Sequence, residues 1–584
     1  MASENLNKKQ RAQPLRRGKA CLNCRHLKIK CDGARPVCGQ CTRVPKEDPC
    51  EFTDTMSRTQ ELESTVQRLQ FRLNELQGVA GPSNHGHGGR YRQASDARSS
   101  PFSGSSGSDA SPTFPSFNSR PHSAPSSDSS FLDFQEPPLV VIQMLLQTFL
   151  PHATQFGFFL HPQRFSDAAL LPLPFGDERR PSPALLCVVY LYGVHLSQSQ
   201  PLLASEPVFL KRAQQNISTE LSVHTHPMHI LHTIQAQVLL SSYLFRTKRF
   251  LEAEFYANGA ATLALGYQFH KIRSARPGTP PLLGVPVLLE VYPTPPADAI
   301  EEGERIRAFW AVACLQSNLN IALNAASGAF CILESPGTEI DTPWPLELAD
   351  YEAGAIPPGY SGQESIRHFL TDDPLPPSPA CMLHAKASVL LYRAARLGAR
   401  WSPTFQPQER AAYATSYTWL DRRITQFWES LPPIYTFYTD SASASARTVV
   451  LAHALTAAAA IKLNHSAAAS GSSVEAQAKC VDATRAILAI FGDEAVRDRV
   501  IAHPVVGSLM TMACRVLMDE VRRARAFRTT WAAGVGSALP PPSKEEVSFV
   551  EEVRAGMGTL AVYAVGCPLI EYQLRKIRQQ YDTM

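Results

Sequence analysis

Six cysteines near the start of the chain constrain it more than any other feature. They follow the spacing C-x2-C-x6-C-x6-C-x2-C-x8-C, at Cys21, Cys24, Cys31, Cys38, Cys41 and Cys50. A C-x2-C turn brings two thiolates to one small cation, and structural zinc takes four ligands in a tetrahedron. Six thiolates are too many for one zinc ion, and they satisfy two ions only if two thiolates bridge the metals. The spacing therefore predicts a two-zinc cluster.

A simpler alternative is one zinc ion held by the two C-x2-C pairs, Cys21, Cys24, Cys38 and Cys41. Cys31 and Cys50 would then be incidental thiols. The two interpretations differ in metal stoichiometry, which is two zinc ions per chain for the first and one for the second.

Positive charge is concentrated around these cysteines. Residues 1–50 contain twelve Lys or Arg and four Asp or Glu, so this segment carries +8. Since the whole chain carries +4, the remaining residues carry −4. A metal-stabilised loop with this much positive charge predicts binding to nucleic acid.

The segment from Lys19 to Cys38 resembles the fungal zinc binuclear cluster family of transcription factors. The resemblance implies that Cys21 and Cys38 bridge the two metals. One zinc ion would be held by Cys21, Cys24, Cys31 and Cys38, and the other by Cys21, Cys38, Cys41 and Cys50.

The family's DNA-reading pattern, C-R-x-x-K-x-K-C, is matched by Arg25, Lys28 and Lys30. The resemblance implies that Lys28 reads a CGG triplet in the major groove, where guanine presents two acceptors, O6 and N7. Many relatives carry a second basic residue just before this lysine, and this chain has Leu27 there.

Residues 1–20 form a basic arm in front of the cluster at residues 21–52. Such arms serve as nuclear import signals and as phosphate contacts, and Arg17 and Lys19 are the candidate contacts. The alternative is a solvated tail without a partner.

A short heptad pattern follows the linker at residues 53–58. Over residues 59–77 the apolar residues take the a and d positions of a heptad, which predicts a parallel two-stranded coiled coil and a homodimer. These residues are Leu62, Val66, Leu69, Leu73 and Leu76. The alternative is an amphipathic helix packed on its own chain.

Residues 78–130 are expected to form a disordered linker. From Gly81 to Ser130 there are 16 Ser, 6 Gly and 6 Pro, and no Leu, Ile, Val or Met. Such a composition offers too little apolar surface to offset the entropy of ordering.

Residues 131–584 are expected to form a large all-α domain, because apolar residues recur at helical spacing and no strand-type alternation is sustained. Four segments resemble the middle homology region of the fungal regulators, a helical regulatory domain. They are 159–165, the helix from Gln235 to Gly266, 305–310 and 340–345. Proline-rich stretches at 277–297, 336–380 and 540–542 are expected to be surface loops.

The sequence thus predicts a mostly α protein that regulates transcription of RNA polymerase II genes in the nucleus, with double-stranded DNA and co-regulators as partners. An enzyme is not expected, because the common catalytic motifs are missing. A membrane partner is not expected either, since the apolar run from Ala184 to Val194 is too short to span a bilayer. The alternative is a sensor that binds an effector or a co-regulator and has only weak DNA affinity.

Overall fold

The computed structural model describes residues 20–21, 23–24, 27–43, 50, 136–197, 199–223, 227–274, 295–323, 340–362, 364–371, 375–434, 444–497 and 503–584. It divides the chain into two compact units, Met1–Pro121 and His122–Met584. In these residues the units contain helices and turns but no β-strand, apart from one isolated bridge between Ser274 and Gly362. The predicted class, a small cysteine-rich unit followed by a large all-α unit, is confirmed.

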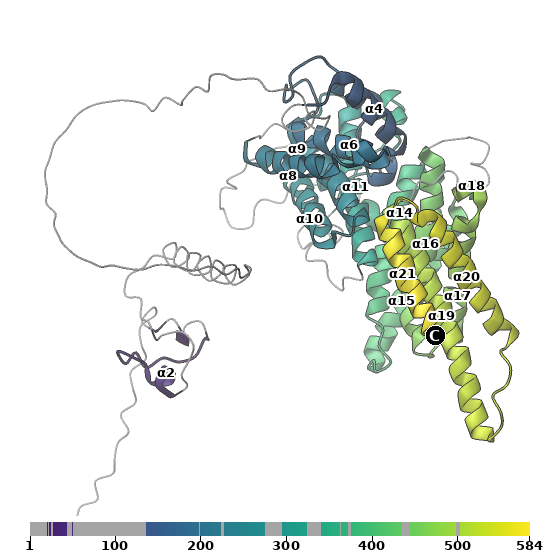
Figure 1. The fold of residues 1–584 in the computed structure, drawn as a ribbon. Helices are drawn as coiled ribbons and strands as arrows, with labels where there is room; N and C mark the ends of the chain where they lie inside the picture. Colours follow the sequence, from purple (N-terminus) through teal and green to yellow (C-terminus); the bar gives the residue numbers. More distant parts are fainter. Residues whose placement is uncertain are drawn as a thin grey trace, which may run out of the picture. The chain divides into compact units, whose positions relative to one another are not determined.

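The elements of both units are shown in Figure 1. The N-terminal unit contains α2 (Gly39–Arg43). The first part of the helical unit contains α4 (Leu139–Phe149), η2 (Leu150–Phe156), α5 (Pro162–Ala169), α6 (Pro183–Leu196), α7 (Gln200–Leu203), α8 (Glu206–Val223), α9 (Pro227–Arg246), α10 (Phe250–Gly266), η3 (Phe269–Lys271), α11 (Ala299–Ala322), α12 (Leu348–Glu352) and α13 (Ser365–Thr371). The second part contains α14 (Ala380–Ala399), α15 (Pro407–Ser430), α16 (Ala444–Ala469), α17 (Val474–Gly492), α18 (Glu494–Arg497), α19 (Pro504–Val535), α20 (Lys544–Ala564) and α21 (Pro568–Asp582).

The helix α6 forms the centre of the first part. Ser182 caps it by accepting the N–H of Leu185, and Pro183 occupies its first turn. Every residue from Ala184 to Val194 is buried. A helix that is apolar on all sides belongs inside a protein core, and α6 packs against α4, α8 and α9.

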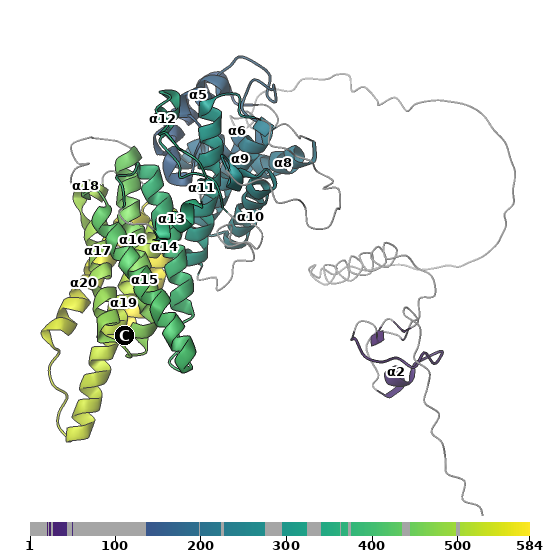
Figure 2. The same ribbon diagram turned by 180° about the vertical axis from the view of Figure 1, so that it is seen from behind.

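The helix α16 has the corresponding position in the second part. It is long and apolar enough to cross a membrane by length and composition, but 67% of its most apolar window is buried in the protein. It packs between α14 and α17, and Figures 1 and 2 show this neighbourhood from opposite sides. This 26-residue helix, rather than the stretch from Ala184 to Val194, is the membrane-length candidate in the described part of the chain.

The helix expected around Gln235 is broken once. Backbone N–H groups of Lys248 and Arg249 bond to the carbonyls of Phe245 and Leu244, while Lys248 has a φ of 68°. These bonds form a Schellman motif, which ends α9, so that Phe250 begins α10. The expected close packing is present. The alanines of α10 are buried against α9, and a Cβ on Gly259 would lie 2.7 Å from Oε1 of Gln237.

The segment 336–380 is not simply a surface loop, contrary to the expectation. Asp341, Thr342 and Leu346 are buried, and α12 and α13 lie within the segment. The indole of Trp344 stacks on that of Trp310 with 4.2 Å between the ring centroids. This stacking anchors the segment to α11. The proline content of the sequence did not reveal this anchoring.

The segments that resemble a middle homology region meet in space. The N–H of Phe159 donates to Oε1 of Gln235 at 2.7 Å. The N–H of His161 donates to Oε1 of Glu304, immediately before Arg305, also at 2.7 Å. The indole N–H of Trp310 donates to the carbonyl of Pro343. These contacts join the four segments into one packed region.

Candidate metal centre and nucleic-acid interface

Four cysteine sulfurs gather at the centre of the N-terminal unit. The Sγ atoms of Cys21 and Cys38 are 3.6 Å apart, those of Cys24 and Cys38 are 3.6 Å apart, and those of Cys21 and Cys41 are 3.8 Å apart. With a Zn–S bond of about 2.3 Å, a tetrahedral zinc ion places its sulfurs about 3.8 Å apart. The spacing of these thiols therefore suits zinc.

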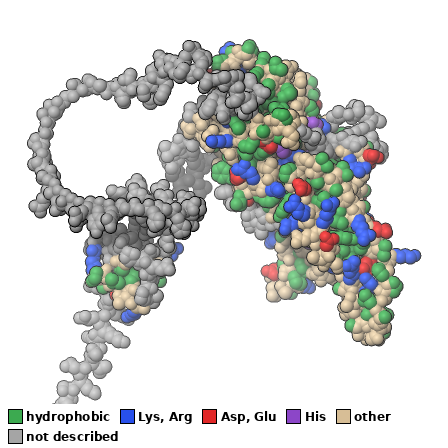
Figure 3. All heavy atoms as spheres, viewed as in Figure 1, with side chains coloured by type: hydrophobic (Ala, Val, Ile, Leu, Met, Phe, Trp, Pro, Cys, Tyr) green, Lys and Arg blue, Asp and Glu red, His purple; other side chains and the backbone are tan. Residues whose placement is uncertain are grey.

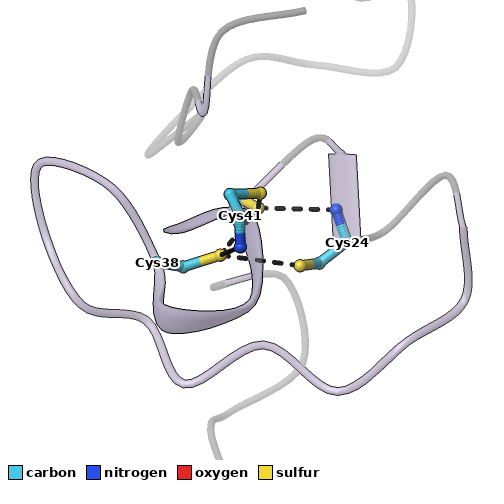
Figure 4. Close-up of side chains that lie close together, drawn as sticks. Cys24, Cys38 and Cys41 are labelled. Carbon is cyan, nitrogen blue, oxygen red and sulfur yellow. Dashed lines mark hydrogen bonds between the residues drawn. The ribbon is translucent and has the colours of Figure 1, made fainter. Parts of the chain in front are cut away.

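The order of these contacts singles out two cysteines. Cys21 and Cys38 touch each other, and each also touches one further cysteine, so that the contacts run from Cys24 through Cys38 and Cys21 to Cys41. In Figure 4 the sulfur of Cys38 faces that of Cys24, and Cys41 lies beside them. The two central positions are those of the cysteines that the family resemblance assigns to the bridge.

The remaining two cysteines adjoin the same group. The Sγ of Cys31 lies within 4.8 Å of that of Cys38. The Sγ of Cys50 accepts the N–H of Cys38 at 3.3 Å. Cys21, Cys24, Cys38 and Cys41 also lie within 4.8 Å of one another, as one zinc ion would require. Cys38 is therefore close to Cys31 as well as to the other three cysteines of the central set. With Cys38 shared in this way, the six-cysteine cluster is consistent with two zinc ions.

The two halves of the cluster repeat the same local structure. The N–H of Cys24 donates to Sγ of Cys21, and the N–H of Cys41 donates to Sγ of Cys38, each at 3.4 Å. Each C-x2-C pair thus begins a helical turn whose backbone points an N–H at the first thiolate. The spacing of two residues produces this geometry because it matches the first turn of a helix.

Without a cation, the thiols of Cys21, Cys24 and Cys41 resist ionisation, because their pKa values are raised. Burial is the largest cause that raises the pKa of Cys24, to about 12, and it also raises the pKa of Cys21. For Cys38 burial acts in the same direction, but the N–H of Cys41 and the neighbouring thiols lower its pKa to about 6. A compact set of thiolates is therefore stable only with a strong positive charge among them.

The donor set fits zinc in identity as well as in spacing. All six ligand candidates are sulfur, which suits a structural zinc site closed to solvent. Bound zinc would supply the cation that holds the thiolates together and thereby orders the loops between them. The chain's own contribution is the pair of helical turns that places the thiols.

The residue Asp32 contributes to this unit without having been singled out in the sequence. Its carboxylate accepts the N–H of Gly39 at 3.0 Å and that of Ala34 at 3.3 Å. These bonds, that of Gly39 first, lower the pKa of Asp32. Asp32 thereby ties the loop after Cys31 to the start of α2. An Asp followed by Gly is a turn signal, which fits the local bond to Ala34 but does not reveal the bond to Gly39.

Lys28 ends the helical turn that begins at Cys24. The N–H of Ile29 donates to the carbonyl of Cys24 at 3.0 Å, and Lys28 has a φ of 53°. This six-to-one bond with a left-handed residue inside it is a helix C-terminal cap. Lys28 is exposed, and its backbone is fixed by a turn that starts at a candidate zinc ligand.

Lys28 and Lys30 are both exposed, and two apolar residues beside Lys28 are exposed as well. Leu27 is 50% exposed and Ile29 is 43% exposed. Figure 3 shows Lys and Arg side chains at the surface of the described part of this unit, with hydrophobic side chains between them. A cationic surface of this kind suits a polyanionic partner.

Several predicted site residues lie outside the described residues. These are Arg17, Lys19 and Arg25 among the DNA contacts, and the dimerisation residues Leu62, Val66, Leu69, Leu73 and Leu76. The linker at 53–58 and the segment 78–130 lie outside them too.

Comparisons with known proteins agree with the geometry. Residues 19–59 match the fungal Zn(2)-Cys(6) binuclear cluster domain. The chain is also similar to the transcriptional activator protein acu-15 of Neurospora crassa, with 42% identity over 64 residues. This alignment covers 10% of the present chain and 7% of acu-15. No solved structure matches the chain. A Zn(2)-Cys(6) domain is therefore present, and the two matches support a DNA-binding transcription regulator.

Proposed function

We propose that this protein is a nuclear, homodimeric regulator of RNA polymerase II genes that reads CGG-type half-sites through its zinc cluster. In this proposal the two zinc ions are held by the six cysteines, with Cys21 and Cys38 as bridges. The helical unit is the regulatory domain of the kind that the middle homology region forms.

The position of Lys28 carries the proposal. Its side chain is exposed at the end of a turn whose first residue, Cys24, is a candidate zinc ligand. A cation held rigidly at a surface can select base edges, whereas contacts to phosphates position a protein without selecting sequence. In this proposal Lys28 is the reading residue and is aided by Arg25 and Lys30, while Arg17 and Lys19 are the phosphate contacts.

Dimerisation is proposed from the heptad pattern of residues 59–77 alone. A coil of less than three heptads is weak by itself, so DNA binding should strengthen it. The linker at 53–58 would limit the distance between two half-sites. Co-regulators are proposed as partners of the helical unit.

Selection of bound sequences from random DNA duplexes tests this function. The zinc-loaded full chain should enrich pairs of CGG triplets at a fixed spacing. The variant Cys21→Ala, which lacks one proposed bridge, should enrich no sequence, because a cluster without that thiolate cannot hold both zinc ions.

Two results would count against the proposal. Specific binding retained by Cys21→Ala would exclude the bridged cluster as the reading unit. Binding of all duplexes alike by the unmodified protein would favour the alternative, a sensor of effectors or co-regulators with weak DNA affinity.

A further inference from the structure

A cavity of about 140 Å³ lies inside the helical unit. Its wall includes Phe156 of η2, Val238 and Phe245 of α9 and Trp310 of α11 from the first part of this unit. The second part contributes the starts of α14, α16 and α19, including Ala385 and Val505. Residues far apart in sequence thus line one partly open space where the two parts of the unit pack together.

Most of the wall is apolar, and large aromatic side chains dominate it. Phe156, Phe245 and Trp310 are all buried. An apolar cavity of about 150 Å³ in a protein interior is large enough to hold a benzene molecule. The cavity therefore suits a compact ligand about the size of one substituted ring.

A few polar groups interrupt this wall. Nε of Arg307, Oδ1 of Asn318 and Nε2 of His384 are buried and have no hydrogen-bond partner among the residues that the structure describes. Asn318 is only 8% exposed. Buried polar atoms without a partner are uncommon in folded proteins and cost free energy. Three such atoms lie on side chains lining one cavity and could bind the polar atoms of a ligand.

The charges of the wall compensate each other. The guanidinium of Arg307 lies 3.6 Å from the carboxylate of Glu347, and both residues line the cavity. Burial lowers the pKa of His384 to about 4 and that of His503 to about 3, so both imidazoles are neutral at pH 7. A site whose charges already compensate each other disfavours a charged ligand, because no unpaired opposite charge offsets the cost of desolvating it.

We propose that this cavity binds a small uncharged molecule with an apolar, ring-sized body and one polar group that both donates and accepts hydrogen bonds. The polar group supplies the missing partners of three atoms, which are Oδ1 of Asn318, Nε2 of His384 and Nε of Arg307. Because the wall draws on both parts of the helical unit, the ligand stabilises their association. This site does not depend on the proposed reading of DNA.

Three probes of similar size test the proposal on the zinc-loaded full chain. Benzyl alcohol has the proposed chemistry, toluene lacks the polar group, and benzoate is charged. The thermal unfolding midpoint of the helical unit is measured with each. At ten times its dissociation constant, benzyl alcohol should raise the midpoint by about 1.5 °C. Toluene should bind less tightly, and benzoate should not shift the midpoint.

Two variants, each paired with a control variant, test whether the shift of the midpoint arises at the cavity. Ala385→Leu fills the cavity and should abolish the shift, whereas Ala399→Leu, at the exposed end of the same helix, should retain it. Asn318→Leu removes an unpartnered polar atom, so the free protein should melt at an equal or higher temperature. With this variant benzyl alcohol should no longer bind more tightly than toluene. Asn320→Leu, on the same helix but outside the cavity wall, should still bind benzyl alcohol more tightly than toluene.

The proposal fails if benzyl alcohol produces no shift or if benzoate shifts the midpoint as much as benzyl alcohol does. It also fails if Ala385→Leu, shown to be folded by its helical circular dichroism, responds as the unmodified chain does. Should Ala385→Leu not fold, an unchanged preference for benzyl alcohol in Asn318→Leu contradicts the proposal by itself.

Discussion

Lys28 and Lys248 both occupy the left-handed region of the backbone, with φ values of 53° and 68°. Both residues end a helical turn through the same six-to-one hydrogen bond. A non-glycine residue in this conformation is under strain, which persists only where the surroundings enforce it. At Lys248 the result is a bend between two helices. At Lys28 the result is an exposed cation in a fixed position next to the cluster.

Removing the side chain of Lys28 tests its role in reading DNA. Lys28→Ala should lose preference for CGG over scrambled duplexes by roughly tenfold or more, because guanine loses its hydrogen-bond donor. Titrations of the full chain against both duplexes measure this ratio. Lys9→Ala, in the basic arm, should instead weaken binding to both duplexes equally and reduce its salt dependence.

Lys28→Gly controls for folding. Glycine adopts a positive φ without strain, so this variant should retain zinc at least as well as the unmodified chain. It should nevertheless lose the preference for CGG. A preserved preference in both Lys28 variants would show that another residue reads the triplet.

Glu304 makes the stability of the helical unit depend on pH. It is buried, and this burial raises its pKa to about 7 from the ordinary 4.5. The native state therefore keeps a proton that the unfolded state loses, and the contribution of Glu304 to stability falls as pH rises from 4.5 through 7. Glu304→Gln should remove this fall and be more stable at pH 8 by roughly 2–3 kcal/mol.

Urea unfolding of both proteins at pH 4.5 and pH 8 measures this difference. The glutamine keeps an oxygen that accepts the N–H of His161, so the contact itself is preserved. Glu429→Gln, at an exposed position, should leave the curves unchanged at both pH values. A variant that is less stable than the unmodified chain at pH 8 would show that Glu304 is held as a charged group.

At the scale of elements, the sequence predicted most where one local rule decides the structure. The cysteine spacing predicted the two turns of the cluster, and the apolar run at 184–194 corresponds to the central helix α6. The predictions made from the sequence were wrong where tertiary contacts decide the structure. The proline-rich segment 336–380 is held by the stacking of Trp344 on Trp310, two residues 34 positions apart, which no local pattern reveals.

The functional sites also combine features that local patterns predict with features that only tertiary contacts decide. The cysteines and Lys28 could be found from their spacing, but the hydrogen bond from Gly39 to Asp32 could not, because it spans a loop whose path is set by the cluster. The cavity was likewise beyond prediction, since helices from both parts of the helical unit form its wall.

The start of α2 offers a test at this scale. A Cβ on Gly39 would lie 2.4 Å from Oδ2 of Asp32. Gly39→Ala should therefore break the link between the loop and α2, and zinc should be lost at a lower chelator concentration. Gly534→Ala, whose added carbon meets no atom within 4 Å, should not change zinc retention.

A double variant identifies the cause. If the clash with Asp32 is responsible, Gly39→Ala should have little further effect in a chain that already carries Asp32→Ala. Additive losses in the double variant would contradict this explanation.

At the scale of the whole molecule, charge and hydrophobicity are divided between the two units. Residues 1–50 carry +8 and the remaining residues carry −4, as counted from the sequence. The N-terminal unit has a core made of cysteines, whereas the helical unit has an extensive apolar core. We therefore expect the first to depend on metal for its fold and the second to be held together by its apolar core. Chelation should abolish DNA binding while leaving the helical unit folded.

The number of zinc ions bound per full-length chain, measured by native mass spectrometry, tests the central claim most directly. We expect two ions in the unmodified chain and a loss of zinc when Cys31 and Cys50 are both changed to serine. A value of one ion, unchanged in that double variant, would mean that Cys21, Cys24, Cys38 and Cys41 hold a single metal, and it would contradict the bridged cluster.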